Sequence, residues 1–353
     1  MALNMRSLRF AIIGAGNIGR IQAEAIARIP DARLTVVCNR GSRAGMDLAK
    51  AHGAEWIPRY QDAVQHPEVD VVSICTPSGT HAEIAETAAA AGKHLLVEKP
   101  LDITLPRVDR ILSAASRANV TLASVFPLRF MKGVHQAKQA LDAGRLGRLT
   151  MADAYVKWYR PPVYYETGWR GTWKLDGGGA LMNQSIHSID LLQWLAGPVD
   201  YVFARTATLS HDIETEDTAT ALLGFAHGGM GVIQGATSCW PGTAARIELQ
   251  GPQGTIVLEE GRIVTWQLAD ADDEEEAAML SLEVGTGSGS QAPMGIGSDN
   301  HRLQIQDLIE AIHGDRAPAV AGDEGRKAVE IVRAIYRSAT TGMPVQLPLA
   351  DDD

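Results

Sequence analysis

The stretch from residue 8 to residue 29 reads LRFAIIGAGNIGRIQAEAIARI, and it decides the fold because an apolar run passes through three glycines into a segment of helical periodicity. Its motif is Gly14-Ala15-Gly16-Asn17-Ile18-Gly19. The first glycine permits a tight turn, the second lets the backbone approach a pyrophosphate, and the third lets the helix pack closely on the strand. The N–H groups of the first helical turn can then receive phosphates. The motif predicts a dinucleotide site; a plain structural turn is the alternative.

The segment that follows this motif keeps the same rhythm to about residue 125. Short β-rich runs alternate with amphipathic stretches, which is typical of a parallel sheet with crossover helices. We expect strands at 9–13, 34–38, 71–75, 94–97 and 120–124, and helices at 17–29, 43–52, 81–91 and 105–118. Residues 1–126 therefore form the predicted Rossmann NAD(P)-binding domain.

The remainder of the chain, residues 127–353, has a different rhythm and predicts a second α/β domain that binds substrate and forms oligomers. Its strand-like segments, separated by Gly or Asp turns, predict a large, mostly antiparallel open sheet. We expect strands at 149–158, 200–209, 217–224, 229–236, 244–250, 254–258, 263–267 and 279–284, and helices at 131–143, 180–195, 300–313 and 323–340. The acidic run 270–276 reads as a turn, and the Gly/Ser-rich stretch 285–298 as a lid candidate.

Composition excludes several classes of function. The net charge is −10, which argues against nucleic acid and anionic membrane surfaces as partners. No run approaches the roughly 18–20 apolar residues of a membrane span, and the first residues lack a signal-peptide pattern. Three cysteines are too few for a disulfide framework. We expect a cytoplasmic protein that forms a homodimer or homotetramer through the open sheet of its second domain.

The residue that follows the second predicted strand bears on the choice of cofactor. This position, about 20 residues after the glycine motif, usually carries Asp or Glu when NAD binds, because a carboxylate accepts from the ribose 2′-hydroxyl. Here it is Asn39, followed by Arg40, Ser42 and Arg43. An amide, a hydroxyl and two guanidinium groups suit a 2′-phosphate. NADP is therefore favoured; in the alternative, the arginines are solvated and Asn39 serves NAD.

A lysine lies at the carboxyl end of the strand LLVEKP, the edge at which open α/β sheets bind ligands. Flanked by Glu98 and Pro100, Lys99 can direct its ammonium group toward a nicotinamide. A surface turn lysine is the alternative.

The segment from Asp176 to Asp190, DGGGALMNQSIHSID, carries the second candidate for chemistry. Asn183 and His187 are four residues apart and share one helix face, while Asp190 is three residues beyond. Hydride removal from a carbinol needs a base, and histidine titrates in the useful range. A satisfied structural histidine is the alternative. One His and one Asp without a further ligand cluster do not predict a metal site.

The loop before this segment concentrates aromatic and basic residues. Aromatic faces stack on sugar rings, and basic groups hold hydroxyls or phosphates. A core or a subunit interface is the alternative use of such a cluster. The candidate substrate contacts are Lys157, Tyr159, Arg160, Tyr164, Trp169, Arg170 and Trp173, with Asp190 and His301 added from the helices.

The sequence carries a family resemblance in GAGNIG, VVSICTPSGTHAEIA, the EKP lysine and GGGALMNQSIHSIDLLQWL taken together. It resembles the glucose–fructose oxidoreductase/inositol dehydrogenase (Gfo/Idh/MocA) family over essentially the whole chain. The resemblance implies oxidation or reduction of a sugar, nucleotide-sugar or cyclitol hydroxyl. It implies that Lys99 and His187 match the family's lysine and histidine, and that Asn183 replaces an aspartate found in many members. Thr76, Pro77, His81 and Glu98 join the implied cofactor site.

Three functions are open at this point. The leading hypothesis is NAD(P)-dependent oxidation or reduction of a secondary ring hydroxyl, with C3 of a pyranose favoured and a cyclitol next. A nicotinamide-dependent glycosidase that uses transient oxidation is the second, and it would release sugar without accumulating NAD(P)H. A cofactor-sensing protein without turnover is the third, but the presence of both Lys99 and His187 counts against it.

Overall fold

The computed structural model describes residues 6–41, 43–282 and 297–350. The chain divides into two compact units. The first runs to Pro127 and takes in Gly297–Arg326; the second comprises Leu128–Ile296 and the chain from Lys327 on. The units therefore differ from the two predicted domains, since residues 297–326 return to the first.

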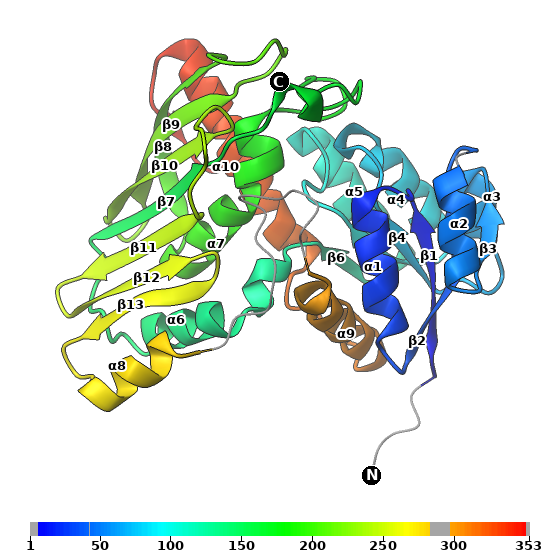
Figure 1. Cartoon of the computed structure of the whole chain (residues 1–353), viewed down its shortest axis with the longest axis horizontal. Coiled ribbons are helices and arrows are strands. Elements are labelled where there is room, and N and C mark those ends of the chain that lie inside the picture. Colours follow the sequence, from blue (N-terminus) through cyan, green and yellow to red (C-terminus); the bar gives the residue numbers. More distant parts are fainter. Residues whose placement is uncertain (1–5, 42, 283–296, 351–353) are drawn as a thin grey trace. The chain divides into compact units, whose positions relative to one another are not determined.

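The first unit contains a six-stranded parallel sheet in the order β3-β2-β1-β4-β5-β6 (Figure 1). The order reverses between β1 and β4, as in the dinucleotide-binding Rossmann fold. Every predicted strand is present, and β3 and α3 were missed because they are short. The elements are β1 (Leu8–Ile13), α1 (Asn17–Ala27), β2 (Ala32–Cys38), α2 (Arg43–Ala51), β3 (Glu55–Ile57), α3 (Tyr60–Gln65), β4 (Val71–Ile74), η1 (Ser78–Thr80), α4 (His81–Ala90), β5 (His94–Val97), α5 (Leu105–Ala118), β6 (Leu122–Ser124) and α9 (Asp299–His313).

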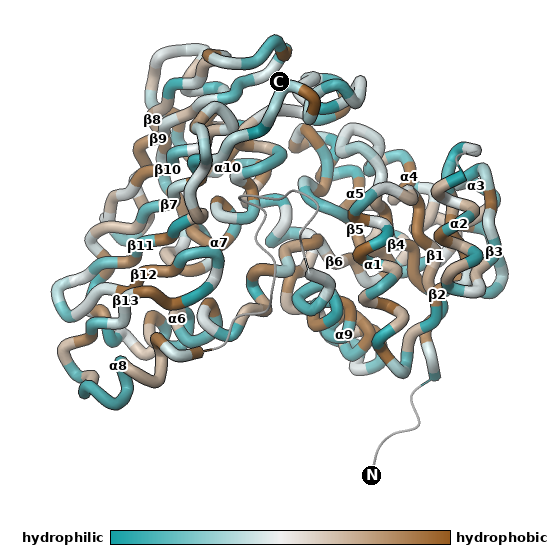
Figure 2. Tube along the Cα trace, viewed as in Figure 1, coloured by the Kyte–Doolittle hydropathy of each residue, from teal (hydrophilic) through white to brown (hydrophobic). Residues whose placement is uncertain are grey.

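The helix α9 belongs to the first unit because its apolar face completes that unit's core. Ile305, Leu308 and Ile309 are fully buried in the same cluster as Phe10 and Ile26. Figure 2 shows how apolar residues gather along the central strands β1 and β4, which are buried on both faces. Arg28, the residue after α1, also forms an ion pair with Asp299 at 2.7 Å, which anchors the first turn of α9.

The second unit contains an eight-stranded sheet in the order β13-β12-β11-β7-β10-β9-β8-β14. Among its described strands only β7 and β10 pair in parallel, so the predicted mostly antiparallel sheet is confirmed. The elements are η2 (Pro127–Phe130), α6 (Lys132–Asp142), β7 (Met151–Lys157), η3 (Pro162–Tyr164), η4 (Ala180–Ser185), α7 (Ile186–Ala196), β8 (Val199–Ala207), β9 (Thr218–Phe225), β10 (Met230–Ala236), β11 (Arg246–Gly251), β12 (Gly254–Glu259), β13 (Arg262–Leu268), α8 (Asp273–Leu280), α10 (Gly322–Thr341) and β14 (Val345–Gln346). The boundary at Arg326 falls within α10.

The predictions of a turn over 270–276 and a strand over 279–284 were wrong for residues 273–280, which form α8, whereas Asp270 does lie in a turn. Asp272 accepts a hydrogen bond from the Glu275 N–H at 2.8 Å and so caps the helix. Arg145 binds both Asp270 and Glu275, and acidic side chains are favourable at a helix N-terminus. Residues 283–284, and most of the lid candidate 285–298, lie outside the described residues.

Candidate active site

The glycine loop has one position open to a ligand and two closed by the protein itself. A Cβ on Gly14 would lie 2.5 Å from the Cys75 carbonyl oxygen, and one on Gly19 would lie 2.1 Å from the Gly14 oxygen. At Gly16 nothing lies within 4 Å of the Cβ position. Gly16 precedes the first turn of α1, whose N–H groups carry no side-chain cap. The loop therefore fits a pyrophosphate, which would occupy the space above Gly16.

At the end of β2, the predicted cofactor residues are placed in different surroundings. Asn39 is half-buried, and α2 approaches it so closely that a Cβ on Gly45 would lie 2.7 Å from the Asn39 Cβ. Arg40 is exposed. Arg43 is also exposed and lies 3.7 Å from Asp47. Ser42 lies outside the described residues. Asn39 is thus held at the strand end, while the two guanidinium groups are solvated.

The loops after β4 and β5 are held together by a buried histidine. The His81 ring lies 2.9 Å from the carbonyl oxygens of both Thr76 and Pro100. Asp102 adds a second tie by accepting from the Ala82 N–H at 2.8 Å. His81 is 1% exposed, so it fixes the loop after β5, which carries Lys99, and its ring is not at the surface.

Glu98, the residue before Lys99, points into the interior of the first unit. Its carboxylate accepts hydrogen bonds from Gln22 Nε2 at 2.6 Å and from the Lys99 N–H at 3.2 Å. Gln22 in turn accepts from the Ser73 hydroxyl. Burial raises the pKa of Glu98 to about 7. The hydrogen-bonded side chains of Glu98, Gln22 and Ser73 therefore lie beneath the loop that carries Lys99.

The histidine segment begins with a π-helical turn, Ala180–Ser185, and continues as α7. The Ser185 hydroxyl closes this turn by donating to the Ala180 carbonyl at 2.7 Å. Such turns are often found at functional sites. Between residues 180 and 190, only Asn183 and His187 are half-exposed, and every other residue is buried. The prediction that these two share one face is consistent with this pattern.

Glycine is required at two positions before this turn, because neighbouring protein groups leave no room there for a Cβ atom. A Cβ on Gly178 would lie 2.1 Å from the Tyr336 hydroxyl, and one on Gly179 would lie 1.9 Å from the Glu216 carbonyl oxygen. The Glu216 carboxylate accepts from the Gly179 and Leu181 N–H groups at 3.0 and 2.8 Å. Sequence reasoning missed Glu216 and Tyr336, because nothing near them in sequence ties them to the glycines.

Four polar side chains, two of them from the histidine segment itself, form a row of hydrogen bonds. Arg160 donates to Gln184 Oε1 through Nε at 3.1 Å and Nη2 at 2.8 Å. Gln184 Nε2 donates to Asn183 Oδ1 at 2.9 Å and to the Tyr164 hydroxyl at 2.7 Å. Asn183 Nδ2 donates to Asp176 Oδ1 at 2.5 Å. Sequence reasoning identified Arg160 and Asn183 but not the amide and carboxylate that complete the row.

The basic side chains of the aromatic loop are not equivalent. Arg160 is 2% exposed, and burial lowers its pKa. Arg170 lies over the rings of Tyr164 and Trp169, at 4.2 and 5.1 Å from their centroids. The Arg170 guanidinium donates to the Tyr164 carbonyl at 3.3 Å, and among the described residues no ion pair joins it to a carboxylate. Arg170 is therefore the better placed of the two to receive an anion.

The other predicted substrate residues in this loop lie nearer the surface. Lys157 lies 5.2 Å from the centroid of the Tyr155 ring. Tyr159 is half-buried and forms an isolated β-bridge with Ser238. Trp173 is 45% exposed and packs edge-on against Tyr336.

Two predicted substrate residues are interior. Asp190 is fully buried, and its two oxygens accept from Arg129 at 2.6 and 2.8 Å. This bidentate pair gives Asp190 a structural contact within the second unit. His301 lies in α9 of the first unit, is 5% exposed, and has its pKa lowered to about 4 by burial.

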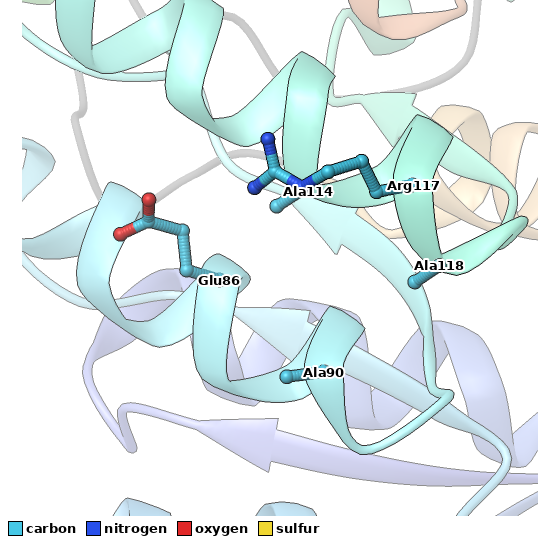
Figure 3. Close-up of a pocket in the computed structure, with 5 residues that line it drawn as sticks. All are labelled: Glu86, Ala90, Ala114, Arg117 and Ala118. Carbon is cyan, nitrogen blue, oxygen red and sulfur yellow. The ribbon is translucent and has the colours of Figure 1, made fainter.

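A surface hollow of about 320 Å³ lies between α4 and α5, lined by Glu86, Ala90, Ala114, Arg117 and Ala118 (Figure 3). Ala90 and Ala118 end their helices, which places the hollow toward the amino ends of the parallel strands. Ligands of open α/β sheets bind at the carboxyl ends. The hollow is therefore not a candidate for the cofactor site. Within the described residues there is no cluster of three potential metal ligands and no helix that could span a membrane.

Comparison with known proteins covers both units. A model described as "Oxidoreductase family, NAD-binding Rossmann fold" matches residues 8–126, and one described as "GFO/IDH/MocA C-terminal domain" matches residues 134–257. Inositol 2-dehydrogenase of Rhizobium meliloti is 30% identical over 94% of this chain and 97% of its own length. Myo-inositol 2-dehydrogenase of Thermotoga maritima is 28% identical over 96% and 98%. The WlbA dehydrogenase of Bordetella pertussis, crystallised with NADH and UDP-GlcNAcA, is 34% identical, with a TM-score of 0.87 over 98% of this chain and 100% of that one.

Proposed function

The chain belongs to the Gfo/Idh/MocA family of oxidoreductases, and from this premise we propose that it oxidises a secondary ring hydroxyl of a pyranose, at C3, with a nicotinamide cofactor. The proposal rests above all on the one half-exposed face of the segment 180–190, which presents Asn183 and His187 together. We propose His187 as the general base that takes the hydroxyl proton and Lys99 as the cation that orients the reacting oxygen. The family resemblance predicted from the sequence is confirmed.

The cofactor would be held by the glycine loop, and when bound it supplies the hydride acceptor. Gly14 and Gly19 shape the turn, and the N–H groups at the start of α1 would bind the phosphates. We propose NADP rather than NAD, because Asn39 brings no negative charge to the end of β2 and the solvated Arg40 and Arg43 lie near enough in sequence to bind a 2′-phosphate, whereas the WlbA structure holds NADH. Calorimetric titration of the protein with both cofactors tests this preference. Tenfold tighter binding of NAD, a difference of about 1.4 kcal/mol, would contradict it.

We propose a nucleotide-linked or acidic sugar as the substrate. The supporting observations are the guanidinium of Arg170 over the rings of Tyr164 and Trp169 and the likeness to a dehydrogenase crystallised with UDP-GlcNAcA. An exposed aromatic face such as Trp173 suits a sugar ring, and a guanidinium suits a carboxylate or phosphate. The likeness to inositol dehydrogenases makes a cyclitol the next candidate.

The decisive experiment is a panel of UDP-sugars, uronates, neutral pyranosides, inositols and linear hydroxy acids, assayed for NAD(P)H and with products assigned by NMR. Turnover of linear hydroxy acids alone would reject the proposal. Release of sugar without net reduced cofactor would indicate a glycosidase. His187→Ala and Lys99→Met should each lower the rate at least about a hundredfold, with cofactor affinity little changed.

We also propose that the protein works in the cytoplasm as a homodimer or homotetramer formed through the exposed face of the second unit's sheet. Phe203 and Leu222 lie opposite each other on β8 and β9 and are 43% and 42% exposed, and Met230 on β10 is 53% exposed. Apolar side chains gathered on one face are typical of interfaces. Sedimentation of the wild type and of Phe203→Asp tests this, since the variant should dissociate. A monomeric wild type would contradict it.

A further inference from the structure

The side-chain amide of Asn183 is held in one orientation by the groups at either end of its row. The Asp176 carboxylate can only accept, so it takes the Asn183 NH₂ group. The Arg160 guanidinium can only donate, so it takes the oxygen of Gln184 and turns the Gln184 NH₂ group toward Asn183 Oδ1. Each side chain of the row therefore donates a hydrogen bond to the next, from the buried Arg160 guanidinium to the buried Asp176 carboxylate.

Asp176 is held in this position by its burial and by a second hydrogen bond. It is 1% exposed, and its second oxygen accepts from the Gly171 N–H at 2.9 Å. It is also the carboxylate in direct contact with the half-exposed face of the histidine segment, on which Asn183 itself has no charge. The other charged and titratable side chains around this row include Arg160, Tyr164, Tyr165 and Arg170 in the preceding loop, His211 with Asp217 against Arg160 and Tyr165, Glu216 and Tyr336 at the start of the π-helical turn, and Arg129 with Asp190 at α7.

We propose that Asp176 is a positioning residue for proton transfer and acts on His187 through Asn183. This inference rests on the proposed function, in which His187 is the base. Asp176 fixes which end of the Asn183 amide faces the site, and its negative charge favours the protonated form of an imidazole one helical turn away. His187 thereby becomes a stronger base, although its neighbour on the helix is an amide.

The test compares Asp176→Asn with the exchange variant Asp176→Asn/Asn183→Asp. The His187 pKa is measured by NMR titration of histidine-labelled protein, with the signal assigned from His187→Gln. We expect Asp176→Asn to lower this pKa by about one unit and kcat by about tenfold. The dissociation constant for NADH should not change, because the glycine loop proposed to hold the cofactor is unaltered in this variant. The exchange variant retains one carboxylate and one amide side by side and should restore both values.

Thr172→Val is the matched control in the same loop. It removes the hydrogen bonds of the Thr172 hydroxyl with Trp169 and Leu175 but no charge, so it should lower stability and leave the His187 pKa unchanged. An unchanged pKa in Asp176→Asn, or a folded exchange variant that keeps the low value, would overturn the inference. If Asp176→Asn does not fold, the exchange variant decides. Because the titration needs no substrate, failure to find turnover would reject the proposed function without affecting this result.

Discussion

The Tyr336 hydroxyl donates a hydrogen bond of 2.9 Å to the carboxylate of Glu216. This contact lies against the glycine run that begins the histidine segment, so the two residues fix where that segment starts. Burial raises the pKa of Glu216 from 4.5 to about 7, in spite of the hydrogen bonds from Tyr336, Gly179 and Leu181. The carboxyl group is therefore harder to ionise in the folded protein than in the unfolded chain.

This shift predicts that stability falls as the pH rises. Below pH 4.5 the group is protonated in both states and has no effect; between pH 4.5 and about 7 the unfolded chain ionises first, and the folded state loses about 3 kcal/mol. Glu216→Gln should remove this part of the slope in urea unfolding followed across that pH range. An unaltered slope in the variant would mean that Glu216 ionises normally in the fold.

Alanine at Gly16 should weaken cofactor binding, whereas alanine at Gly19 should lower stability. Gly16→Ala meets no atom within 4 Å, so the folded protein should keep its melting temperature but bind NAD(P)H at least about tenfold more weakly, because the methyl group occupies the phosphate position. Gly19→Ala places a Cβ 2.1 Å from the Gly14 oxygen and should lower the melting temperature. Calorimetry and thermal unfolding separate the two. Wild-type affinity in Gly16→Ala would argue against a phosphate at this position.

Asp190 should matter for stability rather than for substrate binding. Its bidentate pair with Arg129 is buried, and removing one partner of such a pair typically costs about 3–5 kcal/mol. We expect Asp190→Asn to lower the free energy of unfolding by an amount of this order, while KM of the remaining folded enzyme stays near the wild-type value. A large rise in KM with unchanged stability would restore the substrate role that the sequence suggested.

Arg170 and Arg160 offer a matched pair of guanidinium groups. Arg170→Met should raise KM at least about tenfold for an anionic sugar and little for a neutral one, because the loss of a charge-assisted contact costs about 1.5–3 kcal/mol. Arg160→Met should instead destabilise the protein, since it leaves Gln184 without its buried donor. Steady-state kinetics on both substrate types, together with thermal unfolding, distinguish the roles. Equal effects of Arg170→Met on both substrates would contradict anion recognition.

The sequence predicted the first unit closely because its signals are local. Buried parallel strands read as continuous apolar runs, and the glycine motif marks the β1–α1 turn. The helix α8 was mistaken for a turn and a strand because its stabilising contacts come from Arg145, 125 residues before Asp270. That α9 packs in the first unit was missed for the same reason, because its apolar pattern does not show which core the apolar face packs against.

The candidate site was predictable where spacing carries the information and not where distant residues meet. Asn183 and His187 could be paired from their separation alone. The spacing could not show that Asp190 is already bound by Arg129, or that Glu216 and Tyr336 explain the glycine run. Each of these contacts joins residues that are at least 37 positions apart in the sequence.

The path of the chain has a consequence for building chimeras from relatives of this enzyme. It crosses between the units after Pro127, before Gly297 and again after Arg326, inside α10. A single recombination point at residue 127 would combine one parent's sheet with another parent's α9, and Ile305, Leu308 and Ile309 would have to fit a foreign core. Exchange of cofactor preference between relatives therefore needs recombination points at all three crossings, so that residues 297–326 are exchanged together with the N-terminal segment.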